Sequence, residues 1–523
     1  MGQVLTWGNR AQLPAQWAAR ARDRLELARG HGLLLGNVVH RFAAVHGDRR
    51  LVEEAGDPPL VLTHGEAAAQ VDEWAEEIGA RIAPGDRVVI AVPNGYRMFL
   101  LCVAASRAGG VAVPVNPAMR ESEVEHVVAD SGATLVLRDP AVIPGERRAG
   151  ASAAATPAPS AGDVAAIFYT SGTTGLPKGA RLSHRALLGH ASMASLWPAG
   201  LRRDEAVMGL PVAHIMGFAL VLVMAAAGVP TYFLPRVRPD ETLDAIESRR
   251  ATVFAGVPAM YRMLVEAGAE TRDLGSVRLW ITGADVMPGA LARRFKAFGA
   301  TATLPGGRSV GEAMFVEGYG MVELAGGLAI KVSPPFLPVG VGESLGIRLP
   351  AYQVKIVDDD GHELPRGQVG ELVVKGPGVL QGYHGDEAAT RAVLTPDGWL
   401  RTGDLVRRGP FGILQFAGRK KEVVKHGGYS VYTTEVERAL EEHPAVAEAA
   451  VVGLPDERLG EVPAAAVRLH AGQAVDEAEL QQWARDRLAE YKVPRQVRLV
   501  DDLPRTGTQK VQKARVRELF AAT

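Results

Sequence analysis

The segment Tyr169–Gly179, which reads YTSGTTGLPKG, has the composition of a loop that grips a phosphate. Its small residues allow backbone N–H groups to turn toward an anion, and its hydroxyls and Lys178 add further donors. It is not a Walker A loop, because Lys178 follows Pro177 and precedes Gly179, where that motif needs Gly and then Ser or Thr. We therefore expect phosphate binding without the architecture of a P-loop NTPase.

Lysine is scarce in this chain: 11 of the 58 basic residues are lysines, and none precedes Lys178. A lysine ammonium is a compact charge on a flexible stem, which suits it to following a phosphate or a carboxylate through a reaction. The lysines that become candidates for chemistry are Lys178, Lys421, Lys425 and Lys510. The lysines that we assign to the ordinary surface are Lys296, Lys331, Lys355 and Lys513.

Four further segments follow the phosphate loop in order: EGYGMVE at 317–323, WLRTGDL at 399–405, GRKKEVVKHGGYSV at 418–431 and LPRTGTQKVQK at 503–513. Together with the loop they resemble the core motifs of the adenylate-forming (ANL) superfamily, and within it the acyl-CoA synthetases that act on fatty or aromatic acids. The resemblance spans roughly residues 32–518. It implies that ATP and a carboxylic acid give an acyl-adenylate and pyrophosphate, after which the acyl group passes to CoA and AMP is released.

The resemblance implies a set of residues that bind ATP or AMP. They are Thr170, Ser171, Gly172, Thr173, Thr174, Gly175, Lys178, Gly283, Ala284, Asp285, Gly318, Tyr319, Gly320, Asp404 and Arg419. The loop and Lys178 would hold the β- and γ-phosphates, Tyr319 would present its ring to adenine, and Asp404 with Arg419 would reach the ribose. Glu323 would bind Mg²⁺, which prefers oxygen ligands and substrate phosphates.

Three residues are implied to be catalytic: Lys510, Glu323 and His214. Lys510 would approach the carboxylate and the α-phosphate and stabilise the charge that develops on phosphorus. His214 would lie at the mouth of the acyl pocket. Lys421 would be the hinge of a mobile C-terminal domain, and Gly427 and Gly428 would line the tunnel for the pantetheine arm of CoA.

The residues expected near the acyl group are apolar. They are Met216, Phe218, Val257, Met260, Met321 and Val322. Because nothing among them would pair a buried charge, they favour a fatty or aromatic acid over an acid with a charged tail.

Two residues depart from the usual motifs: Val322 stands where the family usually has Thr, and Gln509 where it usually has Gly. They leave two alternatives open. The acceptor could be a carrier protein, an amine or another nitrogen nucleophile instead of CoA, or the protein could be a nonenzymatic nucleotide-binding homologue. In addition, the residues 303–316 lengthen the segment before EGYGMVE, and we expect them to reshape the acyl pocket.

Several elements must position these motifs. Short apolar runs at 87–93, 111–115 and 134–137 alternate with helix-like spans and predict parallel βαβ units. The run at 164–169 predicts a strand that leads through the phosphate loop into a helix at 183–195, and the apolar run at 218–229 predicts a buried helix. Strands near 354–357, 371–374 and 413–416 predict a β-rich subdomain.

We expect an α/β fold with two domains: an N-terminal adenylation domain over residues 1–417, and a small α+β C-terminal domain over residues 418–523. In the second we predict helices near 434–443 and 476–490 and a strand near 449–453. A length of 523 residues suits this division, since domains usually have about 100–200 residues.

Composition narrows the partners and the compartment. A formal net charge of −1 is unlike that of a dedicated nucleic-acid binder. The lone Cys102 cannot form an internal disulfide, and the opening residues lack the pattern of a secretory signal, so we expect a cytoplasmic protein. We expect no membrane span and allow a homodimer. The excess of Arg over Lys is typical of a GC-rich bacterial genome.

Overall fold

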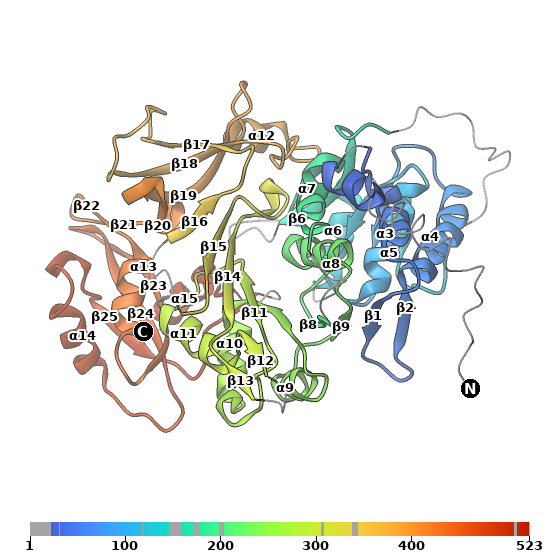
Figure 1. Ribbon diagram of the computed structural model, residues 1–523. Coiled ribbons are helices and arrows are strands. Elements are labelled where there is room, and N and C mark those ends of the chain that lie inside the picture. The colour runs from blue at the N-terminus through green and yellow to red at the C-terminus, as the bar shows by residue number, and fades with distance from the viewer. Residues whose placement is uncertain are drawn as a thin grey trace.

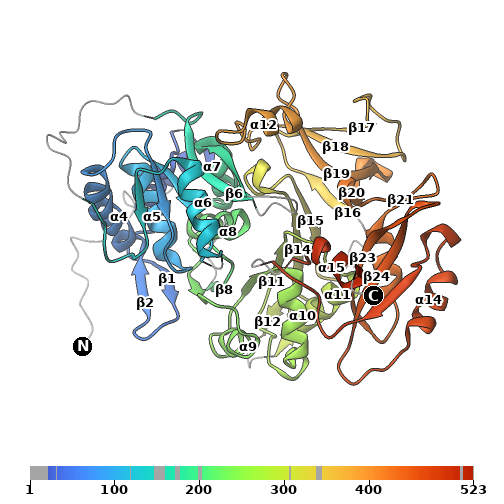
Figure 2. The same ribbon diagram turned by 180° about the vertical axis from the view of Figure 1, so that it is seen from behind.

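The computed structural model describes residues 22–30, 32–117, 119–145, 159–170, 177–197, 203–304, 308–336, 344–506 and 510–521. Figures 1 and 2 show the chain as a row of lobes, from the blue N-terminal part to the red C-terminal part. The predicted fold class, a large α/β domain followed by a small α+β domain, is confirmed.

The N-terminal lobe contains a sheet of order β5-β3-β4-β6-β7. Its strands are β3 (Arg87–Ile90), β4 (Val111–Pro114), β5 (Leu135–Leu137), β6 (Val164–Thr170) and β7 (Lys178–Ser183). The helices of this part of the chain are η1 (Leu35–Asn37), α3 (Val38–His46), α4 (His64–Gly79), α5 (Tyr96–Arg107), α6 (Glu121–Ser131) and α7 (His184–Ala194). Strands β3, β4, β5 and β6 pair in parallel, which confirms the predicted βαβ units.

The phosphate loop does not connect a strand directly to a helix, and this part of the prediction is wrong. Strand β7 follows the loop and pairs antiparallel with β6, with Thr170 opposite Lys178. Helix α7 begins only afterwards, where the Ser183 side chain accepts a hydrogen bond from the N–H of Ala186. The loop therefore connects two paired strands. In β7 the segment ARL has only two apolar residues, separated by Arg181, and this pattern was too weak to reveal the strand.

Among the described residues, thirteen strands form a second, mixed sheet of order β17-β18-β19-β20-β16-β15-β14-β11-β10-β8-β9-β1-β2. Their bounds are β1 (Arg50–Glu54), β2 (Leu60–Thr63), β8 (Ala206–Met208), β9 (Thr231–Phe233), β10 (Val253–Gly256), β11 (Leu279–Gly283), β14 (Met314–Tyr319), β15 (Ala329–Ser333), β16 (Ser344–Arg348), β17 (Gln353–Val357), β18 (Val369–Lys375), β19 (Leu400–Arg408) and β20 (Leu414–Arg419). Strands β9, β8, β10, β11 and β14 pair in parallel, and pairing from β14 to β17 is antiparallel. Ligands commonly bind outside the carboxyl ends of such parallel strands.

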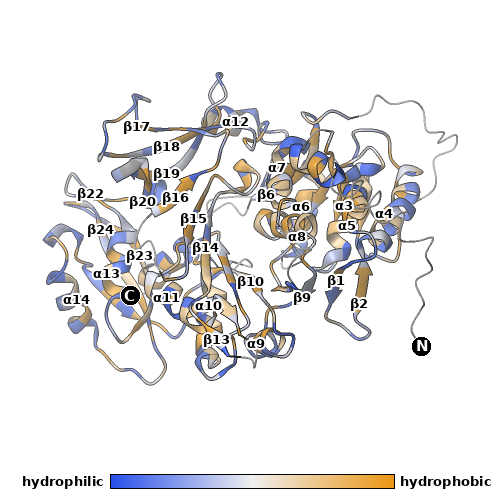
Figure 3. Ribbon diagram, in the orientation of Figure 1, coloured by the Kyte–Doolittle hydropathy of each residue, from blue (hydrophilic) through white to orange (hydrophobic). Residues whose placement is uncertain are grey.

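The helical elements that accompany this sheet are α8 (Ile215–Ala227), α9 (Pro239–Ser248), α10 (Pro258–Glu266), η2 (Ala269–Thr271), α11 (Gly289–Phe298), η3 (Val322–Leu324), α12 (Glu387–Val393), η4 (Pro410–Gly412) and η5 (Lys420–Glu422). Helix α8 confirms the predicted buried helix, and Figure 3 shows it in apolar colours between the two sheets. In the described part of the chain, no helix is long and apolar enough to cross a membrane.

The C-terminal lobe has its own sheet, in which β22-β21-β24-β23 are neighbours and β25 pairs with β24. Its elements are β21 (Val424–His426), β22 (Tyr429–Val431), α13 (Thr433–Glu441), β23 (Val446–Asp456), β24 (Gly460–Leu469), α14 (Glu477–Arg485), η6 (Glu490–Lys492), β25 (Gln496–Leu499) and α15 (Lys513–Ala521). Both predicted helices and the predicted strand are present. Separate cores fill the large and small lobes, which is the property expected of separate domains.

Candidate active site

A buried carboxylate lies where the antiparallel part of the large sheet meets β14. Asp404 on β19 pairs in register with Arg419 on β20, and Arg419 Nε lies 3.3 Å from Asp404 Oδ1. The hydroxyl of Tyr319, at the end of β14, donates to Asp404 Oδ2 at 2.6 Å. Burial raises the pKa of Asp404, and Arg419 and Tyr319 oppose that shift because both favour the carboxylate form.

The backbone before Asp404 is held by its own turn. The N–H of Asp404 donates to Thr402 Oγ1 at 3.1 Å, and the Thr402 hydroxyl donates to the carbonyl of Leu372 on β18 at 2.7 Å. Gly403 has a φ of +71°, which favours glycine between these two residues. The motif RTGDL therefore encodes both the carboxylate and the turn that aims it.

Lys510 is brought to this site by the C-terminal domain. Burial, followed by the positive charge of Arg419, lowers the pKa of its ammonium, while the carboxylates Asp285, Asp404 and Glu323 raise it. Lys510 and Asp285 line a small hollow whose wall also contains Val257 and Ala284. Residues from motifs that are far apart in the sequence thus converge on one place.

His214 precedes α8 and caps it, because its Nδ1 accepts a hydrogen bond from the N–H of Met216 at 3.3 Å. Burial, and then the nearby charge of Lys510, lowers the pKa of His214 to about 4. The ring is therefore neutral at physiological pH and carries its proton on Nε2. It can present an aromatic face and one N–H donor to a bound carboxylate.

The predicted phosphate loop is described only at its two ends. Thr170 ends β6 and Lys178 begins β7, whereas Ser171, Gly172, Thr173, Thr174 and Gly175 lie outside the described residues. The ammonium of Lys178 lies 3.4 Å from Asp386 Oδ2 and 5.7 Å from the centre of the Tyr383 ring. This lysine is therefore held at the end of the hairpin by the segment 383–386.

Glu323 lies on η3, directly after the motif glycines. The hydroxyl of Tyr383 donates to Glu323 Oε1 at 2.8 Å, and the N–H of Leu380 donates to the Glu323 carbonyl at 2.9 Å. Tyr383 thus connects the carboxylate that we predicted for Mg²⁺ with the lysine that we predicted for phosphate. Carboxylate oxygens close to a phosphate-binding lysine are the donor type that Mg²⁺ takes in nucleotide sites.

The segments that were predicted to hold adenine lie side by side at the carboxyl ends of β11 and β14. Gly283 pairs with Gly318, and a Cβ added to Gly283 would lie 2.8 Å from the Gly318 carbonyl oxygen. Ala284 follows with a φ of +68°, an unusual conformation for a residue with a side chain. At Gly320 an added Cβ would lie 1.6 Å from the Gly326 carbonyl oxygen, so this position admits only glycine.

The six predicted acyl-pocket residues divide into three groups. Val257 and Met260 belong to a small apolar cluster with Leu210 and Ala259, against which Met216 packs. Met321 caps η3 and Val322 is its first residue, and both side chains are half-buried. Phe218 was wrongly placed, because it packs edge-on against Phe99 and Phe168 within the main core.

The proposed hinge and CoA residues follow β20. Lys421 is exposed on η5, next to Lys420, whose ammonium pairs with Asp359 at 2.7 Å and with Glu371 at 3.2 Å. Gly427 and Gly428 form the exposed turn between β21 and β22, with φ values of +56° and +86°. In this arrangement the two glycines are accounted for by turn geometry, and their contact with CoA stays a prediction.

Three of the lysines assigned to the ordinary surface have specific partners instead. Lys296 is buried and donates to the Pro334 carbonyl at 2.9 Å. Lys331 is buried and lies 2.7 Å from Glu317 Oε1, its neighbour across β14 and β15. Lys513 hydrogen-bonds to Glu437, and burial lowers its pKa to about 8. A single sequence gives no sign of these partners, since they come from other elements.

The added segment 303–316 does not reach the acyl pocket in the described residues. Strands β12 (Ala302–Thr303) and β13 (Ser309–Val310) form a small hairpin, and Ser309 Oγ donates to the Gly275 carbonyl before β11 begins. The pocket residues lie at the opposite end of β11. The expected effect on the acyl pocket is therefore wrong for this part of the chain.

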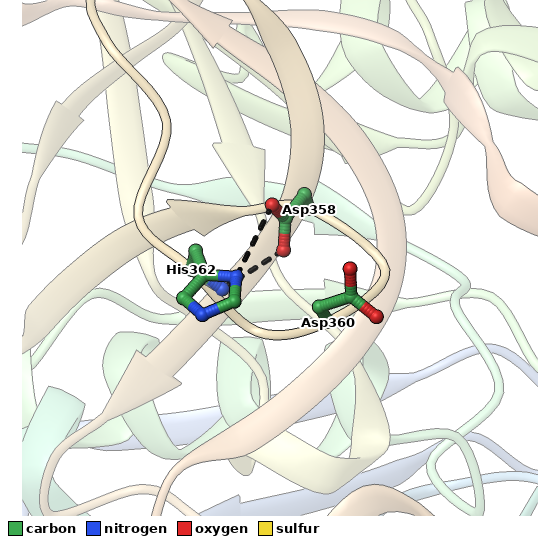
Figure 4. A group of neighbouring side chains, drawn as sticks. All are labelled: Asp358, Asp360 and His362. Atoms are coloured by element: carbon green, nitrogen blue, oxygen red, sulfur yellow. Dashed lines mark hydrogen bonds and ion pairs between the residues drawn. The ribbon is translucent and has the colours of Figure 1, made fainter.

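A second group of side chains of the types that can bind a metal lies in the turn between β17 and β18 (Figure 4). Asp360 and His362 are exposed there, and His362 Nδ1 lies 3.6 Å from Asp358 Oδ2. The N–H of His362 also donates to Asp358 Oδ1 at 2.8 Å. Closure of the turn accounts for this grouping, so we assign it no metal.

Our sequence reasoning missed an ionic cluster that joins the two domains. Glu448 on β23 is buried and accepts from Arg505, and Arg262 Nη1 on α10 approaches it at 3.2 Å. Glu441 on α13 lies 3.7 Å from the same Arg262. Burial raises the pKa of Glu441 to about 7, against the opposing effects of Arg262 and of the Ala449 N–H. No motif marks Glu448, Arg262 or Glu441, because each reads as an ordinary charge on a helix or strand. Arg505 belongs to the motif LPRTGTQKVQK, but the motif does not reveal its partner.

Comparison with known proteins agrees with this geometry. A family model described as AMP-binding enzyme matches residues 39–384, and a model described as AMP-binding enzyme C-terminal domain matches residues 435–510. The chain belongs to the AMP-binding enzyme family. A feruloyl-CoA synthase from an Amycolatopsis species is 34% identical over 481 residues, which cover 88% of this chain and 94% of the relative.

Two further relatives extend the comparison. An indoleacetate–CoA ligase from Aromatoleum aromaticum is 32% identical over 497 residues, covering 89% of this chain and 94% of the relative. The crystal structure of ATP-bound MatB from Rhodopseudomonas palustris matches with a TM-score of 0.78 at 32% identity, covering 93% of this chain and 99% of that one. The expected activity is confirmed: the protein is an acid–thiol ligase that activates a carboxylic acid with ATP and transfers the acyl group to CoA.

Proposed function

We propose that this arrangement of the two domains is the one that performs adenylation, and that the substrate is an apolar acid with a ring. The observation that carries the first part is the position of Lys510, which comes from the C-terminal domain and lines the same hollow as Asp285 of the large domain. The charges of Asp404 and Glu323 also act on its ammonium. An ammonium held there can stabilise negative charge on the α-phosphate while the carboxylate oxygen attacks and pyrophosphate leaves.

The other predicted residues then have distinct tasks. Asp404 and Arg419 hold the ribose, since a buried carboxylate can accept hydrogen bonds from both hydroxyls once Tyr319 turns its own hydroxyl away. Gly283, Ala284, Asp285, Gly318, Tyr319 and Gly320 shape the adenine site. Neutral His214 stands beside the reacting carboxylate and donates from Nε2. These contacts orient the two substrates rather than take part in covalent chemistry.

Magnesium is proposed at Glu323. Its carboxylate is an oxygen donor fixed by Tyr383, and the Lys178 ammonium lies 5.7 Å from the centre of the same tyrosine ring. When bound, the ion would neutralise phosphate charge and favour departure of pyrophosphate. Thr170, Lys178 and the loop between them would position the β- and γ-phosphates.

Transfer to CoA requires a second arrangement, because Gly427 and Gly428 are now exposed at a turn. The chain leaves the large sheet after Arg419, which still pairs with Asp404, so the predicted domain boundary at 417/418 falls inside β20. We place the pivot at Lys420 and Lys421 on η5. Rotation about a few such residues would carry Lys510 out of the site and bring the glycines in.

An acid with a ring is favoured over a straight chain. The apolar cluster of Val257, Met260 and Met216 offers a wall without a charge that could pair with a second carboxylate. The feruloyl-CoA synthase and the indoleacetate–CoA ligase, named above, are similar over most of this chain. We also place the reaction in the cytoplasm, in keeping with a single cysteine, Cys102, that is reduced and buried.

The test is pyrophosphate release from Mg-ATP across a panel of short, long-chain and aromatic acids, each with and without CoA. We expect release with aromatic acids, and formation of AMP and thioester when CoA is added. Release with long-chain acids alone would overturn the proposed substrate class. If pyrophosphate release were the same with and without CoA and no thioester formed, the transfer step would be contradicted. Another nucleophile would then be the acceptor to test.

A further inference from the structure

Helix α8 carries a stripe of side chains that remains partly exposed although the helix lies inside the large domain. The stripe consists of Met216, Ala219, Leu220 and Val223, whereas the rest of the helix is largely buried. Spacings of three and four residues place these side chains on one face. The sulfur of Met216 lies 3.5 Å from the position of a Cβ on Gly283, so the stripe begins beside the adenine segment.

His190 lies at the side of this stripe, on the neighbouring helix α7 (Figures 1 and 2). A Cβ on Gly327 would lie 3.0 Å from His190 Cε1 and 3.4 Å from its Nε2. A Cβ on Gly326 would lie 3.8 Å from His190 Nε2 and 3.6 Å from the Cβ of Ala219. The imidazole therefore lies against the loop that follows Glu323 and next to the stripe.

The ring of His190 has an unused polar atom. Its Nε2 is inaccessible to solvent and has no hydrogen-bond partner among the described residues. Burial lowers the pKa of His190, and the carbonyl of Ala325 opposes that shift. The ring is neutral, and a neutral imidazole in an apolar site favours a ligand that can complete its hydrogen bonds.

Two glycines lie against the ring of His190. Gly326 has a φ of +114°, which favours glycine, but Gly327 has no such backbone requirement. A side chain at Gly327 would press against the imidazole and fill the space between it and the loop. Gly326, Gly327 and His190 are all partly exposed, and on this side the ring is covered by glycine backbone and not by a side chain.

We propose that His190 determines substrate specificity by hydrogen bonding to a hydroxyl group at the far end of an aromatic acid. This inference rests on the proposed function. Ala219 lies five residues after His214, about 7.5 Å along the helix axis, which suits an acid with one ring and a short side chain. A hydroxyl both donates and accepts, so it satisfies either tautomer of the ring. A plain alkyl chain would leave Nε2 unpaired.

The experiment compares 4-hydroxycinnamic acid with cinnamic acid, which lacks only the hydroxyl. For each acid, kcat/KM for pyrophosphate release is measured with the full-length protein and Mg-ATP. We expect the wild type to prefer the hydroxylated acid by about tenfold to a hundredfold, the discrimination that an unpaired buried polar group produces.

Three variants test the residue itself. His190→Phe should give about the same kcat/KM for the two acids, because it removes the one hydrogen bond that distinguishes them. Its kcat/KM for cinnamic acid should stay within about threefold of the wild-type value. His190→Asn should restore part of the preference, since an amide can bond to a hydroxyl. Gly327→Val should impair both acids and the hydroxylated one more. Gly189→Ala, on the exposed side of the same helix with open space around it, is the control and should change nothing.

The outcomes separate this inference from the proposed function. Turnover of aromatic acids without preference in the wild type, or an equal loss on both acids in His190→Phe, overturns the role of His190 alone. A His190→Phe protein that does not fold leaves the decision to Gly327→Val, whose equal effect on the two acids would also overturn it. Absence of release with every acid overturns the proposed function and this inference with it.

Discussion

Two parts of the active site hold charge in different ways. On the nucleotide side, Asp404 and Arg419 lie on neighbouring strands of one sheet, and Tyr319 reaches them from the same sheet. At the junction between the domains, Glu448 on β23 of the C-terminal domain pairs with Arg262 on α10 of the large domain. No shared sheet connects these two elements. The first arrangement is fixed by folding, whereas the second can be broken and remade without unfolding either core.

The difference teaches how a rigid nucleotide site can serve two reactions. Backbone pairing between β19 and β20 keeps Asp404, the carboxylate that we propose for the ribose, in place within the large sheet. Ion pairs between surfaces hold Lys510 in the site only as long as this arrangement lasts, since their geometry depends on domain position. Each prediction below breaks one side and leaves the other intact.

The largest effect is expected from Lys510→Ala. Removing the ammonium that stabilises the transition state should lower the rate of pyrophosphate release by about 10²–10³-fold and leave ATP binding largely unchanged. A time course of pyrophosphate release measures the rate, and titration with ATP in a calorimeter measures ATP binding. Lys375→Ala, which removes a lysine bonded to the Asp397 carbonyl, is the control. A rate near that of the wild type would show that Lys510 has been given the wrong role.

A smaller loss is expected from Asp404→Asn on the nucleotide side. The amide has the shape of the carboxylate but cannot accept from both ribose hydroxyls, so KM for ATP should rise about 10–100-fold. Asp359→Asn, at an exposed carboxylate that pairs with Lys420, is the matched control. If KM were unchanged while only the thermal midpoint fell, Asp404 would be a structural residue.

Glu448→Gln tests the junction. Arg262 and Arg505 lose their anionic partner, so the arrangement that holds Lys510 becomes less stable and adenylation should slow by about tenfold, equivalent to ~1.4 kcal/mol. Thioester formation from a preformed acyl-adenylate should be unaffected, because it uses the other arrangement. The exposed Glu442, at the end of α13 and next to Glu441, gives the control Glu442→Gln. Equal slowing of both half-reactions would argue against a junction that acts on only one of them.

The smallest effect concerns pH and Glu441. Its pKa is raised to about 7 when the domains are in this arrangement, against an ordinary value of 4.5. Between pH 4.5 and about 7, Glu441 therefore binds more protons in this domain arrangement than when the domains separate. This arrangement is favoured at low pH and becomes less stable as the pH rises toward 7. Glu441→Gln stays neutral, and its adenylation rate relative to the wild type should rise several-fold from pH 5.5 to pH 8. A constant ratio across that range would contradict this linkage.

Much of the fold followed from local patterns. Alternating apolar runs predicted β3, β4 and β5, and the amphipathic spacing predicted α13 and α14. Strand β7 was not predicted, because a short strand beside a glycine-rich loop has too few apolar residues to be distinguished from the loop. Phe218 was misplaced for a related reason: in a helix that is apolar all round, periodicity does not show which side faces a pocket.

The residue types that could carry the chemistry of this protein can be recognised from its sequence alone. The motifs carry residue types, such as the lysine of a phosphate loop and a carboxylate in a glycine turn, whose functions depend on their own groups and nearest neighbours. Only the tertiary structure decided which of these groups meet. The contact of Tyr383 with Glu323, the cluster around Glu448 and the packing of Gly326 and Gly327 against His190 each join distant segments. Such contacts depend on how the domains and helices pack, and that packing leaves no local pattern in a single chain.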